Sequence, residues 1–206
     1  MIQVFGHKAP DTDSTGSPLI WAWYLSEVRK TPAKAVLQGT PNTEAVWMLG
    51  RWGVEVVTAA DADSAVSANG PFDAILVDAP CSSTGTVRRH PDIPWLKSET
   101  DLGKLGALQT RLLDHAASLL KPGGLLVYCT CSLEREEGED QIAALLARNP
   151  ALRRDAIRAE EVSGQAEFIT AAGELRTLPC HWPDAESRLA GLDGFYAARI
   201  STVEGT

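Results

Sequence analysis

The stretch FDAILVDAPCSSTG, residues 72 to 85, joins an apolar β-strand to a turn that contains a proline and a cysteine. Its first half is rich in apolar residues and is bounded by turn residues, a pattern typical of a strand. Asp78, Pro80 and Cys81 stand where that strand ends. A carboxyl group, a rigid turn and a thiol at one strand end suit a reactive site, so the surrounding fold decides what this stretch does.

Strands and helices alternate along the rest of the chain. The apolar positions from Leu102 to Leu119 recur every three or four residues, which indicates a long helix with one buried stripe. Strands are predicted at 1–5, 33–39, 54–59, 72–79, 125–132 and 194–200, and helices at 17–30, 41–53, from Glu99 onward, and at 139–147. This order predicts an α/β fold, a doubly wound, mostly parallel Rossmann-like sheet with helices on both faces. Residues 149 to 190 show no clear pattern.

Composition points to an ordinary globular protein, with 44% hydrophobic and 22% charged residues. The sequence shows neither a signal peptide nor a run of about 18 apolar residues, so we expect a cytoplasmic protein without a membrane partner. The net charge of -8 argues against strong unaided binding to nucleic acid, because phosphate neutralisation requires a basic face. A local patch around Arg88 and Arg89 stays open, and no DNA partner is expected.

The predicted topology brings several thiols together. Neighbouring parallel strands end at one edge of a sheet, so Cys81 should lie near Cys129 and Cys131 if the strands that precede them pair. A thiolate at this edge could attack an electron-poor ring. Addition at pyrimidine C6 makes C5 nucleophilic enough to take a methyl group, and a later elimination releases the thiol.

Other readings of the cysteines stay open. The Cys-x-Cys pair could serve packing alone, and Cys129 is expected to be structural. A zinc site is a further alternative, although its spacing matches no common finger or ribbon. Its ligands would be Cys129, Cys131, Cys180 and His181.

Residues from about 54 to 200 resemble the catalytic domain of the Sun, or RsmB-like and Nop, family of RNA cytosine-C5 methyltransferases. The resemblance is carried by DAPCSSTG, VRRHPDIPWLK, the run ending in LLVYCTCSLEREEGE, and the closing GLDGFYAARI. It implies an enzyme that uses S-adenosylmethionine to methylate RNA, with ribosomal RNA as the expected partner.

The same resemblance implies roles for individual residues. Cys131 corresponds to the nucleophile, and Cys81 to the cysteine that assists product release. Asp78 and Pro80 would hold the cytosine edge, and Asp78 is also placed beside the cofactor. Asp61 is the acidic residue expected to contact the adenosine moiety.

The first 53 residues read differently. They contain no glycine-rich loop of the type DxCAAPGGKT, which the family uses to approach the methionine part of the cofactor. Their VFGHKAPDTDST is similar to the start of family II, manganese-dependent inorganic pyrophosphatases of the DHH group. That resemblance implies Mn²⁺ ligands at His7, Asp11 and Asp13, although the remaining ligands of such a metal pair are not found.

We therefore predict a chain assembled from two partial domains that form one compact domain. Residues 1 to 53 would be the pyrophosphatase-like segment, and residues 54 to 206 the C-terminal part of a class I methyltransferase domain. The predicted function is S-adenosylmethionine-dependent RNA cytosine-C5 methylation, impaired if the missing loop prevents cofactor binding. The alternatives are a manganese-dependent phosphohydrolase and an inactive α/β domain.

Overall fold

A computed structural model describes most of the chain, namely residues 2–5, 12–37, 45, 46, 49, 51, 57, 58, 71–96, 98–186 and 190–203. The chain divides into two compact units, Met1–Gly70 and Pro71–Thr206. The predicted junction at residue 53 therefore falls inside the first unit. Each unit is described by itself.

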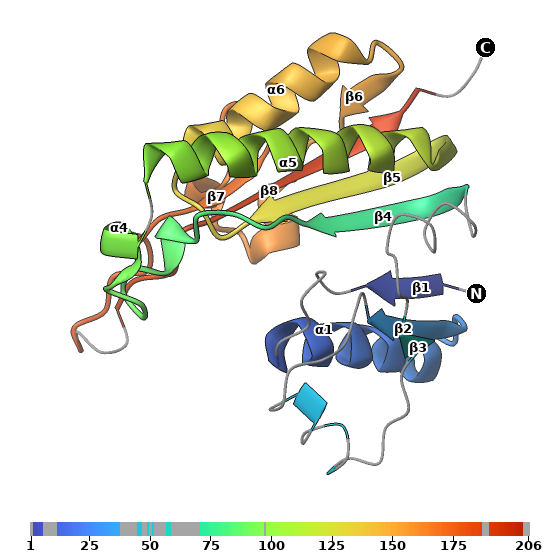
Figure 1. The fold of residues 1–206 in the computed structure, drawn as a ribbon, viewed down its shortest axis with the longest axis horizontal. Coiled ribbons are helices and arrows are strands. Elements are labelled where there is room, and N and C mark those ends of the chain that lie inside the picture. Colours follow the sequence, from blue (N-terminus) through green and yellow to red (C-terminus); the bar gives the residue numbers. More distant parts are fainter. Residues whose placement is uncertain are drawn as a thin grey trace. The chain divides into compact units, whose positions relative to one another are not determined.

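The first unit is a parallel β-α-β arrangement (Figure 1). Strand β1 (Ile2–Phe5) pairs with β2 (Ala33–Leu37), which pairs with the short β3 (Val57–Thr58). Helix α1 (Thr12–Trp23) continues directly into a π-helical segment, Tyr24–Val28. The predicted order of strand, helix and strand is confirmed for this unit.

Helix α1 begins earlier than predicted. The sequence pattern placed its start at Ser17 with Pro18 in the first turn, whereas the helix starts at Thr12 and contains Pro18 in its interior. Threonine, aspartate and serine all favour helix starts, so the polar residues before Ser17 can begin the helix one turn or more earlier. Of the predicted helix at 41–53, the structure describes Ala45, Val46, Leu49 and Arg51, all helical.

The second unit is built on a five-stranded sheet. Its order is β4-β5-β8-β6, with β7 paired to β8 beside this path. The strands are β4 (Phe72–Asp78), β5 (Leu120–Thr130), β6 (Leu152–Arg154), β7 (Leu175–Thr177) and β8 (Phe195–Thr202). β4 and β5 run parallel, but β8 is antiparallel to β5, β6 and β7. The α/β class is confirmed, while this sheet is mixed where a mostly parallel one was predicted.

The helices of this unit follow their sequence patterns. Helix α5 (Glu99–Ser118) begins with a capping box in which Ser98 and Asp101 bond each other's backbone N–H groups. Helix α6 (Glu139–Arg148) lies beside α5, and both cover one face of the sheet (Figure 1). Short helical segments complete the unit, at Thr84–Thr86, Ile93–Leu96 (α4), Arg135–Glu137, Ala159–Val162 and Ala166–Phe168.

The core lies between these helices and the sheet. Tyr128 and Tyr196, on β5 and β8, are fully buried with their rings edge-on and their centroids 6.4 Å apart. Leu113 from α5 and Ile142 from α6 are also fully buried against them. This packing fixes β5 and thereby the position of the residues that follow Thr130. Across the described ranges, no helix is both long and apolar enough to span a membrane.

Candidate functional site

The carboxyl ends of β4 and β5 lie side by side. Asp78, the last residue of β4, stands opposite Cys129 in the parallel ladder. The next backbone N–H, from Ala79, donates to the Cys129 carbonyl at 2.9 Å. The turns that follow the two strands therefore start from the same edge of the sheet, as the sequence predicted.

These turns bring two thiols into contact. The sulfur atoms of Cys81 and Cys131 lie 3.5 Å apart, and both side chains are partly buried. The Ser83 hydroxyl lies 3.5 Å from the Cys131 sulfur on the same turn as Cys81. The prediction that both thiols reach one shared place is confirmed.

The contact makes the two thiols unequal. The pKa of Cys131 is lowered to about 6, chiefly because the Cys81 thiol donates a hydrogen bond to its sulfur, while burial acts in the opposite direction. The Ser83 hydroxyl also favours the Cys131 thiolate. The pKa of Cys81 is raised, because ionisation would break its bond to Cys131 and because it is buried. The contact therefore favours a single negative charge on the pair, carried by Cys131 rather than by Cys81.

Cys129 differs from both. It is buried, and its thiol donates to Asp78 Oδ1 at 3.7 Å. Burial and the nearby Asp78 charge raise the pKa of Cys129. It is held as a neutral thiol, in keeping with the structural role predicted for it.

Two glycines allow the Cys81 turn to approach Cys131 closely. The Gly85 N–H donates to the Cys131 carbonyl at 2.9 Å, and the Gly194 N–H donates to the Gly85 carbonyl at 2.8 Å. A Cβ on Gly85 would collide with the Gly194 carbonyl oxygen and lie 2.8 Å from the Cys131 carbonyl oxygen. Glycine is therefore required at this crossing of three segments.

The turn also contains a strained residue. Ser83 adopts a left-handed conformation with φ of 61°. This conformation is uncommon for a residue with a side chain and tends to occur at functional sites. Here it accompanies the contact between the Ser83 hydroxyl and the Cys131 sulfur.

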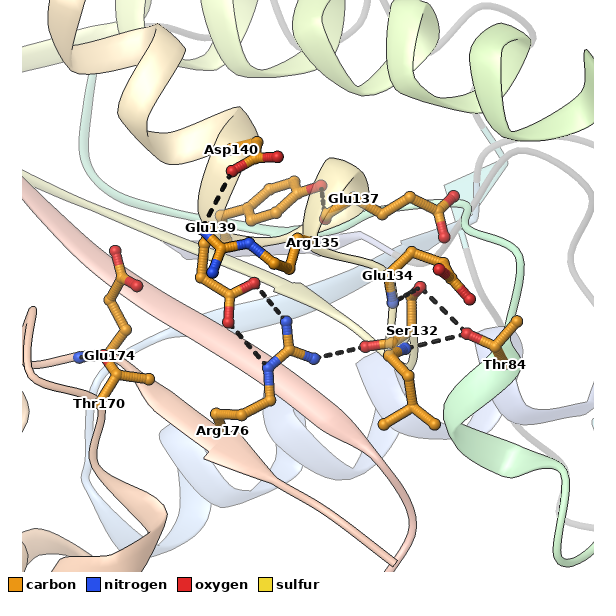
Figure 2. A network of polar contacts seen from close by, with 12 residues as sticks. Thr84, Ser132, Glu134, Arg135, Glu137, Glu139, Asp140, Thr170, Glu174 and Arg176 are labelled. Atoms are coloured by element: carbon orange, nitrogen blue, oxygen red, sulfur yellow. Dashed lines mark hydrogen bonds and ion pairs between the residues drawn. The ribbon is translucent and has the colours of Figure 1, made fainter. Parts of the chain in front are cut away.

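A polar network supports the segment after Cys131 (Figure 2). Ser132 is fully buried, and its hydroxyl accepts the Glu134 N–H at 3.0 Å and lies 3.3 Å from Thr84 Oγ1. Arg176 on β7 donates to the Ser132 carbonyl at 2.6 Å and forms a two-point ion pair with Glu139. This network joins β7 and the start of α6 to the Cys131 turn.

The remaining predicted residues are placed as follows. Asp78 and Pro80 are exposed at the same edge, and the Pro80 carbonyl accepts from Gln109 Nε2 at 2.8 Å. Asp61 lies outside the described residues. So do His7 and Asp11, while Asp13 is described only as a backbone position in α1.

No metal centre forms in the part of the chain that the structure describes, where no group of three or more His, Cys, Asp or Glu could hold an ion. The zinc alternative is not supported. Cys180 is exposed, and His181 instead stacks on Phe168 and accepts the Leu178 N–H through Nδ1.

Arg88 and Arg89 are engaged within the protein. Arg88 donates to the carbonyls of Ala190 and Gly191, and Arg89 pairs with Asp193 at 2.7 Å. Both arginines thus hold the loop that leads to Gly194. The Asp193 carboxylate neutralises the charge of Arg89, so Arg89 contributes less to a basic patch that could bind RNA phosphates.

The second unit is thus an α/β unit in which two touching thiols lie beyond the carboxyl ends of two parallel strands, an arrangement that fits the methyltransferase resemblance. Comparison with known proteins agrees. The model of the family described as 16S rRNA methyltransferase RsmB/F matches residues 39–201. The chain belongs to this family, which confirms the methyltransferase resemblance.

Individual relatives are also named as ribosomal RNA methyltransferases. Ribosomal RNA small subunit methyltransferase B of Shewanella oneidensis is 41% identical over 129 residues, which are 63% of this chain and 27% of the relative. The protein of that name in Klebsiella pneumoniae is 56% identical over 82 residues, which are 40% of this chain and 19% of the relative. The chain thus matches 27% and 19% of the length of these two relatives.

Solved structures share the fold. The crystal structure of PH0851 matches with a TM-score of 0.66 at 28% identity. The match covers 86% of this chain and 39% of the PH0851 chain. NSun6 from Pyrococcus horikoshii, solved with SFG, has a TM-score of 0.67 at 18% identity and covers 99% of this chain and 48% of its own. The α/β fold of the chain is therefore the one found in these solved structures.

The pyrophosphatase resemblance gains no support from these matches. The family match begins at residue 39, so residues 39 to 53 fall inside the methyltransferase family. The assembly of the chain from two partial domains stays a prediction. The first strands and helices of different parallel α/β proteins have similar apolar patterns, so such a pattern does not by itself distinguish one family from another.

Proposed function

We propose that the protein is an S-adenosylmethionine-dependent RNA methyltransferase that acts on cytosine C5, with ribosomal RNA as substrate. The observation that carries the proposal is the contact between the Cys81 and Cys131 sulfurs at 3.5 Å. In such a pair, the ionised thiol can add to a pyrimidine ring, and the neutral thiol can assist the later release of the ring. Membership of the 16S rRNA methyltransferase family supports RNA as the substrate class.

In the proposed reaction, the Cys131 thiolate bonds to cytosine C6, and C5 becomes electron-rich. C5 would then take the methyl group that S-adenosylmethionine supplies when bound, as the methyl–sulfur bond of the cofactor breaks and leaves S-adenosylhomocysteine. Loss of the C5 proton re-forms the ring double bond and breaks the C6–S bond, which returns the Cys131 thiolate.

Cys81 is suited to remove the C5 proton. Its pKa is raised while Cys131 bears the negative charge. That charge disappears when Cys131 bonds to C6, so the pKa of Cys81 falls and its thiol can release its proton to solvent water. The resulting thiolate accepts the C5 proton, and Cys81 ends the cycle as a thiol.

Asp78 and Pro80 are the residues we assign to the cytosine edge. Both lie exposed beside the thiols, and the Pro80 carbonyl is fixed by Gln109. A carboxyl group beside a rigid turn can orient an extruded base by its polar edge. Asp78 also stands at the carboxyl end of a strand, where an open α/β sheet binds its ligands. This place fits the second role proposed for Asp78, a contact with S-adenosylmethionine.

Methyl transfer to small-subunit ribosomal RNA tests the proposal. We expect the chain to convert cytosine to 5-methylcytosine with methyl-labelled S-adenosylmethionine, and Cys131→Ser to lower the rate at least about a thousandfold by removing the nucleophile. Cys180→Ser, which changes an exposed thiol, should leave the rate unchanged. Absence of 5-methylcytosine with the unmodified chain would favour the inactive α/β alternative. Phosphate release from pyrophosphate with Mn²⁺ would instead favour the phosphohydrolase, and none is expected.

A further inference from the structure

Glu137 is a fully buried carboxylate behind the Cys81 turn. Its two oxygens each accept the Ser82 N–H at 3.0 Å, and Oε2 also accepts the Ser82 hydroxyl at 2.5 Å. Gln109 Nε2 donates to Oε1 at 3.1 Å. These donors satisfy the carboxylate, whose burial without partners would be unfavourable.

The contacts hold the chain on both sides of Cys81. Glu137 binds Ser82 directly, and Gln109, which it also binds, donates to the Pro80 carbonyl at 2.8 Å. Cys81 lies between these two fixed residues. Gln109 and Ser82 are themselves fully buried, so the arrangement has little room to shift.

The same network reaches the Cys131 turn. The Ser82 hydroxyl, which donates to Glu137, lies 3.1 Å from the hydroxyl of Ser132, the residue that follows Cys131. Tyr128 on β5 donates its hydroxyl to the Glu137 carbonyl at 2.8 Å, which anchors the Glu137 backbone to the strand that leads to Cys131. Glu137 therefore holds both the turn that carries Cys81 and the turn that carries Cys131.

We propose that Glu137 is a positioning residue that sets the Cys81 thiol against the Cys131 sulfur and so maintains the Cys131 thiolate. The proposal deepens the function proposed above, since it treats Cys131 as the nucleophile. Glutamine in place of Glu137 would present an N–H₂ group toward donors that need an acceptor, so the Cys81 turn would shift. The uncharged side chain would also remove a nearby negative charge that helps to keep Cys81 protonated.

Site-resolved alkylation of Cys131 by iodoacetamide across pH 4.5 to 10, read by mass spectrometry, tests this assignment. We expect a midpoint near pH 6 in the unmodified chain and a rise of about one pH unit in Glu137→Gln. Glu136→Gln changes an exposed neighbour and should leave the midpoint in place. Leu145→Ala removes a fully buried core side chain, so it should lower the melting temperature of the protein without moving the alkylation midpoint of Cys131.

An unchanged midpoint in folded Glu137→Gln would overturn the assignment, as would an equal rise in Leu145→Ala. If Glu137→Gln does not fold, Ser82→Ala tests the assignment in its place. This variant keeps the Glu137 carboxylate but removes the hydroxyl that lies between Glu137 and Ser132. A smaller rise is expected there, and no rise would overturn the proposal. Alkylation needs neither RNA nor methyl donor, so its result stands whether or not the methyl-transfer experiment succeeds.

Discussion

Cys81→Ala is expected to raise the alkylation midpoint of Cys131 by about two pH units, from near 6 toward the ordinary cysteine value of about 8.5. The hydrogen bond from the Cys81 thiol is the largest influence that lowers the pKa of Cys131. Burial, which opposes ionisation, would remain after the substitution. The hydrogen bond between Cys131 and the Ser83 hydroxyl, 3.5 Å apart, would also remain and would keep part of the lowering of the pKa.

Cys129→Ala is the matched control. Cys129 is a buried thiol at the same sheet edge, but its hydrogen bond goes to Asp78. Its replacement should leave the Cys131 midpoint near pH 6. Equal midpoints for Cys81→Ala and the unmodified chain would show that the sulfur contact does not stabilise the thiolate.

Gly85→Ala is expected to lower the free energy of unfolding by about 3 kcal/mol or more, the upper range for overpacking. The added methyl group would meet the Gly194 carbonyl, which belongs to backbone and cannot rotate away. Relief of this clash requires the Cys131 and Gly194 segments to separate. The hydrogen bonds between Gly85 and both segments would then weaken.

Thermal or denaturant unfolding measures this loss, with Gly103→Ala as the control. Gly103 lies in helix α5 with open space around its position, so alanine there should stabilise the protein by about 0.5 to 1 kcal/mol. Similar stabilities for Gly85→Ala and the unmodified chain would contradict the close crossing of the three segments.

Local pattern and topology were sufficient to predict the paired thiols. The strands before Cys81 and Cys131 are apolar and end at polar turns, and parallel pairing brings such ends together. The stripe from Leu102 to Leu119 likewise fixed helix α5, whose start is marked by the Ser98 cap. Each of these features depends on a few neighbouring residues.

Features that depend on distant partners could not be predicted. Strands β6 and β7 have only three residues each and form by pairing with β8. Segments this short have no hydrophobic periodicity from which a strand could be predicted within residues 149 to 190. Glu137 stands in the acidic run LEREEGE, and such runs usually face solvent. Only the fold shows that this carboxylate is buried against Ser82.

Covalent capture with RNA that carries 5-fluorocytosine tests the central claim most directly. Fluorine at C5 leaves no proton to remove after methyl transfer, so elimination stops and the nucleophile stays bonded to C6. With S-adenosylmethionine present, the account predicts a protein–RNA adduct mapped to Cys131, retained in Cys81→Ala and absent from Cys131→Ser. An adduct mapped to Cys81, or none with the unmodified chain, would contradict it.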